Sequence, residues 1–385
     1  MADADSSFTL TLRDGVDGCD AAAWDALSGG HPFASHAFLA LLEESGSVGK
    51  GTGWQALPLL LHDAAGTLRG AVAAYAKAHS QGEYVFDHSW ADAWERAGGD
   101  YYPKLQIAAP FTPVPGPRLL AQDDGSRRAL ITGIEQLVRD NGLSSAHATF
   151  LTDVDRAQFE ASGWLIRQGH QFHWRDEGYG DFDGFLGALT SRRRKAIRKE
   201  RATAHGAVTI AAKTGADISP ADWDLMWACY QDTGARKWGR PYLTRRAFEL
   251  IGERMAERVV LMTAHDRRSG EGVAAALNFI GKDALYGRYW GALIEVPALH
   301  FELCYYQAID WALAHGLSRV EAGAQGEHKL ARGYRAVPTW SAHYIPHAGF
   351  RDAVAEFLTA ERAAEAEMLR LYAEETPFRE SDQAA

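Results

Sequence analysis

The densest group of ionisable residues in the chain lies in the segment from Val320 to Tyr334, VEAGAQGEHKLARGY. Its three glycines permit close backbone approach and unusual dihedral angles around the polar side chains. Core packing explains so many charged groups poorly. We therefore expect a functional site here, with these candidate members: Gln325, Glu327, His328, Lys329, Arg332 and Tyr334.

Three residues are candidates for a general base. His328 carries an imidazole, which titrates near neutrality and needs little tuning. Glu302 and Glu327 are the alternatives. Each carboxylate also has a structural interpretation, because Glu302 could complement a helix dipole in a first turn and Glu327 could pair with a cation in its own turn. The sequence leaves the choice of base open.

A second candidate group lies in the segment LYGRYWG, residues 285–291, which predicts a strand. Side chains alternate across a strand, so we expect Tyr286, Arg288 and Trp290 to share one face. A guanidinium among aromatic rings suits recognition of a carboxylate or phosphate. Three further cations follow a Trp-rich helix and are candidates for binding the same anion: Arg236, Lys237 and Arg240.

A metal site and a cysteine nucleophile are weaker interpretations of the candidate residues. Two histidines and two glutamates are chemically adequate zinc ligands: His300, Glu302, Glu321 and His328. The chain has no HExxH motif, however, and His300 and Glu302 are poorly spaced if a helix has begun there, so we expect no metal site. Cys229 and Cys304 are expected to be packing residues rather than nucleophiles.

The second half of the chain predicts a definite order of elements that would position these residues. A strand near 207–213 is followed by helices near 220–234 and 244–257. Three β-rich runs come next, at 259–265, 273–280 and 284–290. A helix from about residue 300 ends at Gly316, strands follow at 319–323 and 339–345, and the last stretch predicts a docking helix at 351–373.

Landmarks of this half recur in the first half in the same order. Gly70-Ala-Val-Ala-Ala is echoed by Gly272-Val-Ala-Ala-Ala, and Gly142-Leu-Ser by Gly316-Leu-Ser. We infer that one unit is present twice. The expected domains are 1–178, with a proline-rich insertion at about 90–125, and 179–385.

The first half predicts strands at 8–13, 55–62, 69–77, 83–88 and 145–150 and a helix at 126–140. Five prolines between residues 101 and 118 exclude a helix interior and disfavour a central strand, so we expect an ordered loop there. That loop either contributes to function or braces the first core. In the functional interpretation, Lys104 and Arg118 donate to an anionic ligand.

A basic helix is expected at 182–205, with an interruption near Thr190. Seven of the ten residues from 192 to 201 are cationic: Arg192, Arg193, Arg194, Lys195, Arg198, Lys199 and Arg201. A solvated helix face usually alternates in sign, whereas a nearly pure basic run favours a phosphate-bearing partner. If that partner is tRNA, binding should weaken steeply with salt.

The order of elements resembles the GNAT acyltransferase fold, in which two central parallel strands splay apart and leave a cleft. The implied fold class is α/β (α+β), with tandem GNAT-like domains whose mixed sheets are flanked by helices. In such a unit, residues 285–291, 299–306 and 320–334 would line one cleft, which adds His300 to the candidate substrate contacts.

More specifically, nearly the whole chain resembles the FemAB-like branch of that superfamily. The motifs that carry this resemblance are SRRRKAIRKER, ARKWGRPYL from Ala235, GRYWG from Gly287, HFELCYY from His300 and GAQGEHKLARGY from Gly323. It implies an N-acyltransferase that moves an aminoacyl or acyl group to an amine acceptor. Lys329, which precedes the Gly-aromatic pair Gly333-Tyr334 as in those relatives but with a longer gap, would stabilise the oxyanion formed during attack.

The resemblance also bears on the donor. Acetyl-CoA enzymes carry a glycine-rich turn before the helix that follows the central strand, where backbone amides hold the pyrophosphate. The corresponding connection here, residues 292–300, has no glycine. Together with the basic run, this favours aminoacyl-tRNA over acyl-CoA as donor, with no tightly bound cofactor. A peptidoglycan or peptide recognition module without turnover is the remaining alternative.

The composition of the chain limits the classes of function that can be expected. The chain has 385 residues, of which 46% are hydrophobic and 23% charged, and these values are typical of soluble globular proteins. The net charge of −10 makes nucleic-acid binding by the whole surface improbable, so any such contact must be local. Three scattered cysteines, no signal-like start and no long apolar run predict a cytoplasmic protein without membrane insertion.

Overall fold

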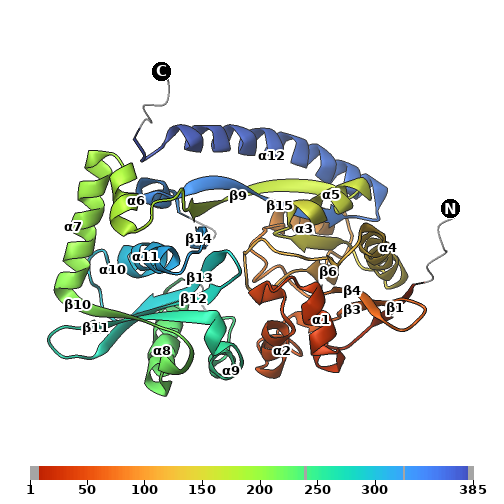
Figure 1. The fold of residues 1–385 in the computed structure, drawn as a ribbon. Helices are drawn as coiled ribbons and strands as arrows, with labels where there is room; N and C mark the ends of the chain where they lie inside the picture. The colour runs from red at the N-terminus through yellow and green to blue at the C-terminus, as the bar shows by residue number, and fades with distance from the viewer. Residues whose placement is uncertain (1–7, 238–240, 324–325, 380–385) are drawn as a thin grey trace. The chain divides into compact units, whose positions relative to one another are not determined.

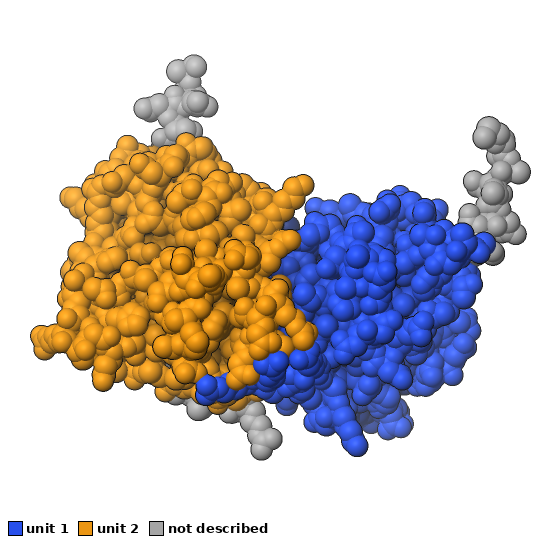
Figure 2. Space-filling view, turned by 60° about the horizontal axis from the view of Figure 1, so that its bottom comes forward, with its two compact units in different colours: residues 1–169, 242–247, 338–366 blue, residues 170–241, 248–337, 367–385 orange. Residues whose placement is uncertain are grey.

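The computed structural model describes residues 8–237, 241–323 and 326–379, with the side chains of residues 235–237 also outside the description. The chain forms two compact units (Figure 2). Unit 1 consists of residues 1–169, 242–247 and 338–366, and unit 2 of residues 170–241, 248–337 and 367–385. The boundary therefore differs from the expected 178/179, because each half of the sequence contributes segments to the other unit.

Unit 2 has a mixed sheet in the order β10-β11-β12-β13-β14-β9. The neighbours are antiparallel except for β13 and β14, which are parallel. The strands are β10 (Val208–Lys213), β11 (Val259–Asp266), β12 (Gly272–Ile280), β13 (Ala284–Ala292), β14 (Arg319–Glu321) and the second half of β9 (Leu165–Arg175). This order confirms the predicted meander followed by a parallel neighbour.

Helices cover both faces of the unit 2 sheet (Figure 1). One face packs on α8 (Pro220–Lys237) and α9 (Arg245–Met255). The other face carries the main core beneath α6 (Phe182–Ala188), α7 (Ser191–Ala207), α10 (Leu299–Phe301), a π-helical turn η5 (Glu302–Tyr306) and α11 (Gln307–Ala314). Short 3-10 turns complete the unit at η3 (Gly215–Asp217), η4 (Ala256–Arg258) and η6 (Glu327–Arg332).

In unit 1 the strands form two sheets. The first has the order β1-β3-β4-β7, and the second contains β15-β8-β6-β5-β2. Their strands are β1 (Thr9–Leu12), β2 (Trp54–Ala56), β3 (Leu59–His62), β4 (Leu68–Val72), β5 (Ala74–Lys77), β6 (Lys104–Ile107), β7 (Leu120–Ala121), β8 (Ala146–Thr149) and most of β15 (Arg335–Tyr344). β6 and β8 are parallel, so each unit has one parallel pair at the corresponding place.

The unit 1 helices are α1 (Ala21–Leu27), α2 (His36–Glu44), α3 (His88–Arg96), α4 (Asp124–Asp140) and α5 (Asp153–Ala161), with 3-10 turns η1 (Val16–Gly18) and η2 (Pro32–Ala34). α4 packs its apolar face on β3, β4 and β8 over the unit 1 core. The C-terminal helix α12 (Ala348–Glu374) confirms the predicted docking helix, but residues up to 366 belong to unit 1.

Several expectations for the first half are wrong. The predicted strands 55–62 and 69–77 are each divided between the two sheets, as β2 and β3 and as β4 and β5. Residues 83–88 form no strand; they lead into α3. Residues 104–107, expected to lie in a loop, form the central strand β6 between β5 and β8. The prolines flank this strand at positions 103 and 110–117, where no ladder hydrogen bond is lost. The proline-rich segment therefore includes part of the core sheet and is not a simple insertion.

Candidate active site

Unit 2 has a pocket where β13 and β14 separate. The parallel pairing of these strands ends at Tyr286 and Glu321. Beyond that point a cavity of about 220 Å³ opens. Its wall comes from both strands, from α8 and from the α10–η5 helix, and includes Gly287, Arg288, Trp290, His300, Cys304, Tyr305 and Gly323. A cavity of this kind, with a few polar groups among aromatic ones, is suited to a small organic group.

A β-bulge in β13 determines which side chains reach the pocket. Leu277 pairs with Tyr289 and Asn278 pairs with Gly287, so Arg288 is an additional residue on its strand. The expectation that Tyr286, Arg288 and Trp290 share one face is therefore wrong, because the bulge interrupts the alternation. Tyr286 lies on the same face as Tyr289, whereas Trp290 lies on the opposite face.

Tyr289 and Trp290, which lie on opposite faces of the sheet, have different surroundings. Tyr289 packs against Tyr230 of α8 and Phe248 of α9, whose ring centroids lie 5.4 and 5.9 Å away. Trp290 packs against His300, with ring centroids 5.1 Å apart. Because Tyr289 and His300 both line the pocket, the pocket draws its wall from both faces of the sheet. Tyr286 is not among the lining residues, and its phenol lies over Gly281 in the β12–β13 turn.

Lys329 is tied by a hydrogen bond to Gly323, a residue of the pocket wall. Its side chain is only 1% exposed, and Nζ donates a hydrogen bond of 2.7 Å to the carbonyl oxygen of Gly323. Gly323, a lining residue, has φ +80°, a conformation that favours glycine. Burial lowers the pKa of Lys329 to about 7. The ammonium is thus weakly solvated, a condition under which a cation interacts strongly with a developing negative charge.

His328 lies beside Lys329 and is tied to the pocket wall. Its Nε2 is 2.8 Å from the hydroxyl of Tyr305. Partial burial of the imidazole, with the charges of Arg332 and Lys329 adding to it, lowers the pKa of His328. Tyr305 also packs near the ring of Tyr334, which is fully buried. The geometry brings His328, Lys329 and Tyr334 together, as the sequence predicted.

Arg332 supports this segment from inside the protein. Its guanidinium donates to the carbonyl oxygen of His328 at 2.8 Å, to Glu200 of α7 at 2.8 Å and to the hydroxyl of Tyr306 at 3.0 Å. It also lies over the ring of Phe301. Because these interactions are all internal, Arg332 holds η6 in place and is not a free substrate donor.

Glu302 is fully buried at the start of the π-helical turn, where it anchors the basic helix. Its Oε1 accepts from Arg201 at 3.3 Å, from His205 at 2.9 Å and from Gln307 at 2.8 Å. Two of these donors lie on α7. These internal bonds favour an architectural role for Glu302 over its candidate role as base.

Of the remaining candidates, Glu327 is exposed and accepts a hydrogen bond of 2.7 Å from Tyr372. Gln325 and Arg240 lie outside the described residues. Arg236 and Lys237 belong to the last turn of α8, but their side chains also lie outside the description. Among the described residues, no group of three or more His, Cys, Asp or Glu side chains is placed to hold a metal ion.

The basic run forms α7. Some of its cations pair with carboxylates of the protein, and others are exposed to solvent. Ile197 and Ala204 face the core, and Arg201 is drawn to Glu302 and Asp310. Arg194 is half-buried, and Arg198 forms an exposed ion pair of 3.3 Å with Asp183. The remaining cations are exposed: Arg192, Arg193, Lys195 and Lys199. A compact positive surface therefore lies on the helix whose inner side contacts Glu302 and η6.

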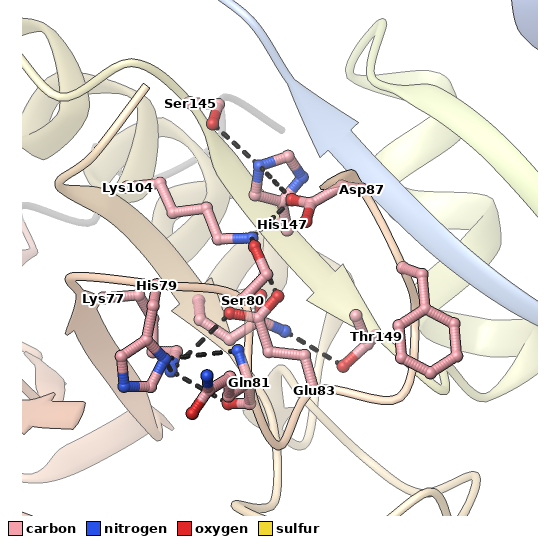
Figure 3. A network of polar contacts seen from close by, with 12 residues as sticks. Lys77, His79, Ser80, Gln81, Glu83, Asp87, Lys104, Ser145, His147 and Thr149 are labelled. Atoms are coloured by element: carbon pink, nitrogen blue, oxygen red, sulfur yellow. Dashed lines mark hydrogen bonds and ion pairs between the residues drawn. The ribbon is translucent and has the colours of Figure 1, made fainter. Parts of the chain in front are cut away.

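Lys104, a predicted anion donor, is buried inside unit 1 (Figure 3). Its Nζ donates to Ser80 and Glu83, both at 2.8 Å, and to Asp87. Although burial alone would lower the pKa of Lys104, these two carboxylates raise it. Lys77, also fully buried, lies 3.7 Å from Glu83. The expectation that Lys104 binds an external anion is corrected, because its hydrogen bonds hold the 80–87 loop to the sheet.

Arg118 is likewise internal. It donates to the carbonyl oxygens of Thr149 and Val114, both at 2.8 Å, and is 4% exposed. Gly116 bridges Leu151 in parallel, beside the end of β8, so the proline-rich segment occupies the place where the two parallel strands of unit 1 separate. The cavity there is only about 10 Å³. The bracing interpretation of this segment is thus the one that the structure supports.

One polar residue of the site, Glu321, was considered from the sequence only as a zinc ligand and not as a catalytic or binding residue. Glu321 ends β14, is 4% exposed and has one oxygen, Oε2, without a hydrogen-bond partner in the described part of the chain. Burial raises its pKa to about 7, although Arg319 opposes this shift. A glutamate between the apolar residues Val320 and Ala322 at a strand end could have indicated this site. Its burial depends on the neighbouring strands, which the sequence does not show.

These paired units and the pocket of unit 2 define a tandem GNAT-like protein. A family model described as peptidoglycan biosynthesis/recognition matches residues 15–380, and the chain belongs to this FemAB-like family. Comparison of the sequence with curated proteins finds no match.

Solved structures share the fold at low identity. FemX has 12% identity and a TM-score of 0.56, with 90% of this chain and 100% of that chain covered. L-PGS from Bacillus licheniformis has 10% identity and a TM-score of 0.51, with coverages of 83% and 96%. A conserved protein of unknown function from Bacteroides thetaiotaomicron has 11% identity and a TM-score of 0.53, with coverages of 87% and 100%. In the part of the chain that the structure describes, no helix could span a bilayer.

Proposed function

We propose that this protein is an N-acyltransferase that moves an aminoacyl group from aminoacyl-tRNA to an amine acceptor of a peptidoglycan precursor. The observation that carries the proposal is the position of Lys329, whose buried Nζ is held on Gly323 in the wall of the pocket between the separated strands. The family to which the chain belongs supports the link to peptidoglycan.

In this proposal the reacting carbonyl of the donor enters the pocket with its oxygen toward Lys329. Attack by the amine places negative charge on that oxygen, and the nearby ammonium stabilises it. The negative charge would in turn favour the protonated lysine, whose pKa burial alone has lowered. The hydrogen bond to Gly323 restrains the direction of the ammonium before the reaction, so little reorganisation is needed.

The donor assignment rests on α7. Its exposed cations form a surface for a polyphosphate, while its inner side contacts Glu302 and η6. The connection between β13 and α10 has no glycine, and its last residue before the helix, Ala298, has φ +64°. A pyrophosphate site built on a glycine-rich turn is therefore disfavoured, so acyl-CoA is the second choice. No tightly bound cofactor is part of the proposal, and the cytoplasm would supply the donor.

The test offers each donor class separately. Purified protein is incubated with charged tRNA pools or with acyl-CoA mixtures, together with amine-bearing peptidoglycan precursors, and amide products are identified by mass spectrometry. We expect product with charged tRNA. Product with thioesters alone would replace the donor assignment, and tight precursor binding without product from either donor would favour a recognition module. Lys329→Met and the exposed Lys282→Met are the matched active-site and control variants.

A further inference from the structure

The proposed acyl transfer, as described above, gives no role to the buried carboxylate of Glu321. One of its oxygens, Oε1, accepts a hydrogen bond of 2.9 Å from Arg319 Nε. The other, Oε2, has no hydrogen-bond partner among the described residues, and His173 Nε2 lies 3.7 Å from this same oxygen, beyond hydrogen-bond distance. A buried carboxylate oxygen without a donor is costly unless something binds there.

The register of the sheet places Glu321 next to the pocket. It pairs with Tyr286 as the last residue of β14 in the parallel ladder, and the following residues, Ala322 and Gly323, line the pocket. A Cβ added to Gly287 would lie 3.5 Å from the Glu321 carbonyl oxygen, so the two strands are in contact just before they separate.

The strand register also defines the face of the sheet on which Glu321 lies. Glu321 shares the face of Tyr286, and the bulge puts Tyr289 on that face as well. Tyr289 lines the pocket and packs on α8 and α9. The helix carrying His300 and Cys304 lies on the opposite face. An acceptor on the α8–α9 side and a donor on the α10 side would thus meet at the separation of the strands.

From this geometry we infer that Glu321 is the catalytic base that receives the proton of the acceptor ammonium. This inference rests on the proposed function. The unpartnered Oε2 takes one proton from R–NH3⁺, leaving R–NH2 and a neutral carboxylic acid. The amine nitrogen then forms a C–N bond with the donor carbonyl carbon, the ester C–O bond breaks, and the Glu321 carboxylic acid returns its proton to the leaving 3′-oxygen. The second proton of the nitrogen passes to the restored carboxylate and from there to water, so one proton is released per amide formed.

The other candidate bases are less suited. Glu302 also has an unpartnered oxygen, but its other oxygen is bound by Arg201 and His205 of α7, and it belongs to the helix on the opposite face of the sheet. Glu327 is exposed and bonded to Tyr372. His328 interacts with Tyr305 and is exposed. Glu321 is the one of these groups that is buried beside the strand separation on the acceptor side.

Several charged or titratable groups face Glu321 and set its proton affinity. They are Arg319 on β14, Tyr286 on β13, Asp283 in the β12–β13 turn, and His173 and Arg175 on β9. Arg319 and Arg175 favour the carboxylate, whereas Asp283 and burial favour the acid. Their balance raises the pKa of Glu321 to about 7, which suits a base that works near neutrality.

The decisive experiment compares two acceptors in one variant. Glu321→Gln keeps the shape of the side chain but cannot accept the proton. With an alkylamine acceptor, protonated at about pH 7, we expect at least a ~100-fold loss of the single-turnover rate. With methoxyamine, which is uncharged at that pH and needs no prior deprotonation, the loss should be less than about fivefold. The ratio of the two losses does not depend on the fraction of folded variant.

The outcomes separate the two proposals. Wild-type protein that makes no amide from either amine would refute the proposed function, and the assignment of Glu321 with it. Active wild-type protein with an equal loss for both amines would overturn only the role of Glu321 as base. The exposed Glu271→Gln serves as the matched control and should retain the wild-type rate with both acceptors.

Discussion

Lys329 Nζ donates a 2.7 Å hydrogen bond to the carbonyl of Gly323, six residues earlier in the chain. This bond closes the glycine-rich segment back on the end of β14 and ties the buried ammonium to Gly323, a residue of the pocket wall. Because burial lowers its pKa, the same lysine is sensitive to pH in the neutral range. Chemistry at this position should therefore depend on both the charge and the placement of residue 329.

Replacing Lys329 should separate these two requirements. Lys329→Met removes the charge, and we expect turnover to fall by roughly 10²- to 10³-fold, the size of effect seen when one oxyanion donor is removed. In the wild type, the lysine loses its proton as pH rises through about 7, so kcat/KM should fall on the alkaline side. Lys329→Arg keeps its charge and should remove this alkaline decline. A Met variant with full turnover would exclude the oxyanion role.

Glu321 should make stability depend on pH. Its pKa is about 7 in the folded protein against an ordinary value of 4.5, so between these values the folded chain holds a proton that the unfolded chain releases. The free energy of unfolding should then fall as pH rises from about 4.5 to about 7, by about 3 kcal/mol from this group. Glu321→Gln should lack this contribution in urea titrations at about pH 5 and about pH 8, and an unchanged slope would contradict the raised pKa.

The exposed cations of α7 should control donor binding. Changing Arg192, Arg193, Lys195 and Lys199 to Gln removes four positive charges that would neutralise phosphates if tRNA lies on this surface. The log–log dependence of affinity on salt should become shallower by about 0.7 to 0.9 for each phosphate that is no longer neutralised. Filter binding of charged tRNA over a salt series measures this slope. Changing four exposed cations elsewhere, Arg128, Arg268, Lys282 and Arg351, should leave it as in the wild type.

Lys104 should affect stability rather than ligand binding. Lys104→Met leaves Glu83 and Asp87 buried without their shared cation, which typically costs about 3 to 5 kcal/mol. Urea unfolding should show this decrease, whereas the exposed Lys50→Met should stay within about 0.5 kcal/mol of the wild type. Reduced affinity for an anionic substrate at unchanged stability would instead restore Lys104 as a ligand donor.

Much of the architecture could be predicted from local pattern. The second-half strands at 259–265, 273–280 and 284–290 are close to β11, β12 and β13, because their apolar, β-rich runs and turn residues specify them locally. The break near Thr190 separates α6 from α7 as expected. The same local reasoning failed for β6, since its flanking prolines obscured a four-residue strand whose neighbours β5 and β8 are distant in sequence.

Local sequence pattern was enough to place Lys329 and His328 in a glycine-rich strand exit, and to show a concentrated run of positive charge in the middle of an acidic chain. Tertiary structure decided which charges do chemistry and which are internal. Burial and pairing depend on residues brought together from distant segments: Lys104 meets Glu83 and Asp87, and Glu302 meets α7. Only the register of β13 and β14 places the unpartnered oxygen of Glu321 beside the pocket, because the bulge at Arg288 changes which side chains share a face.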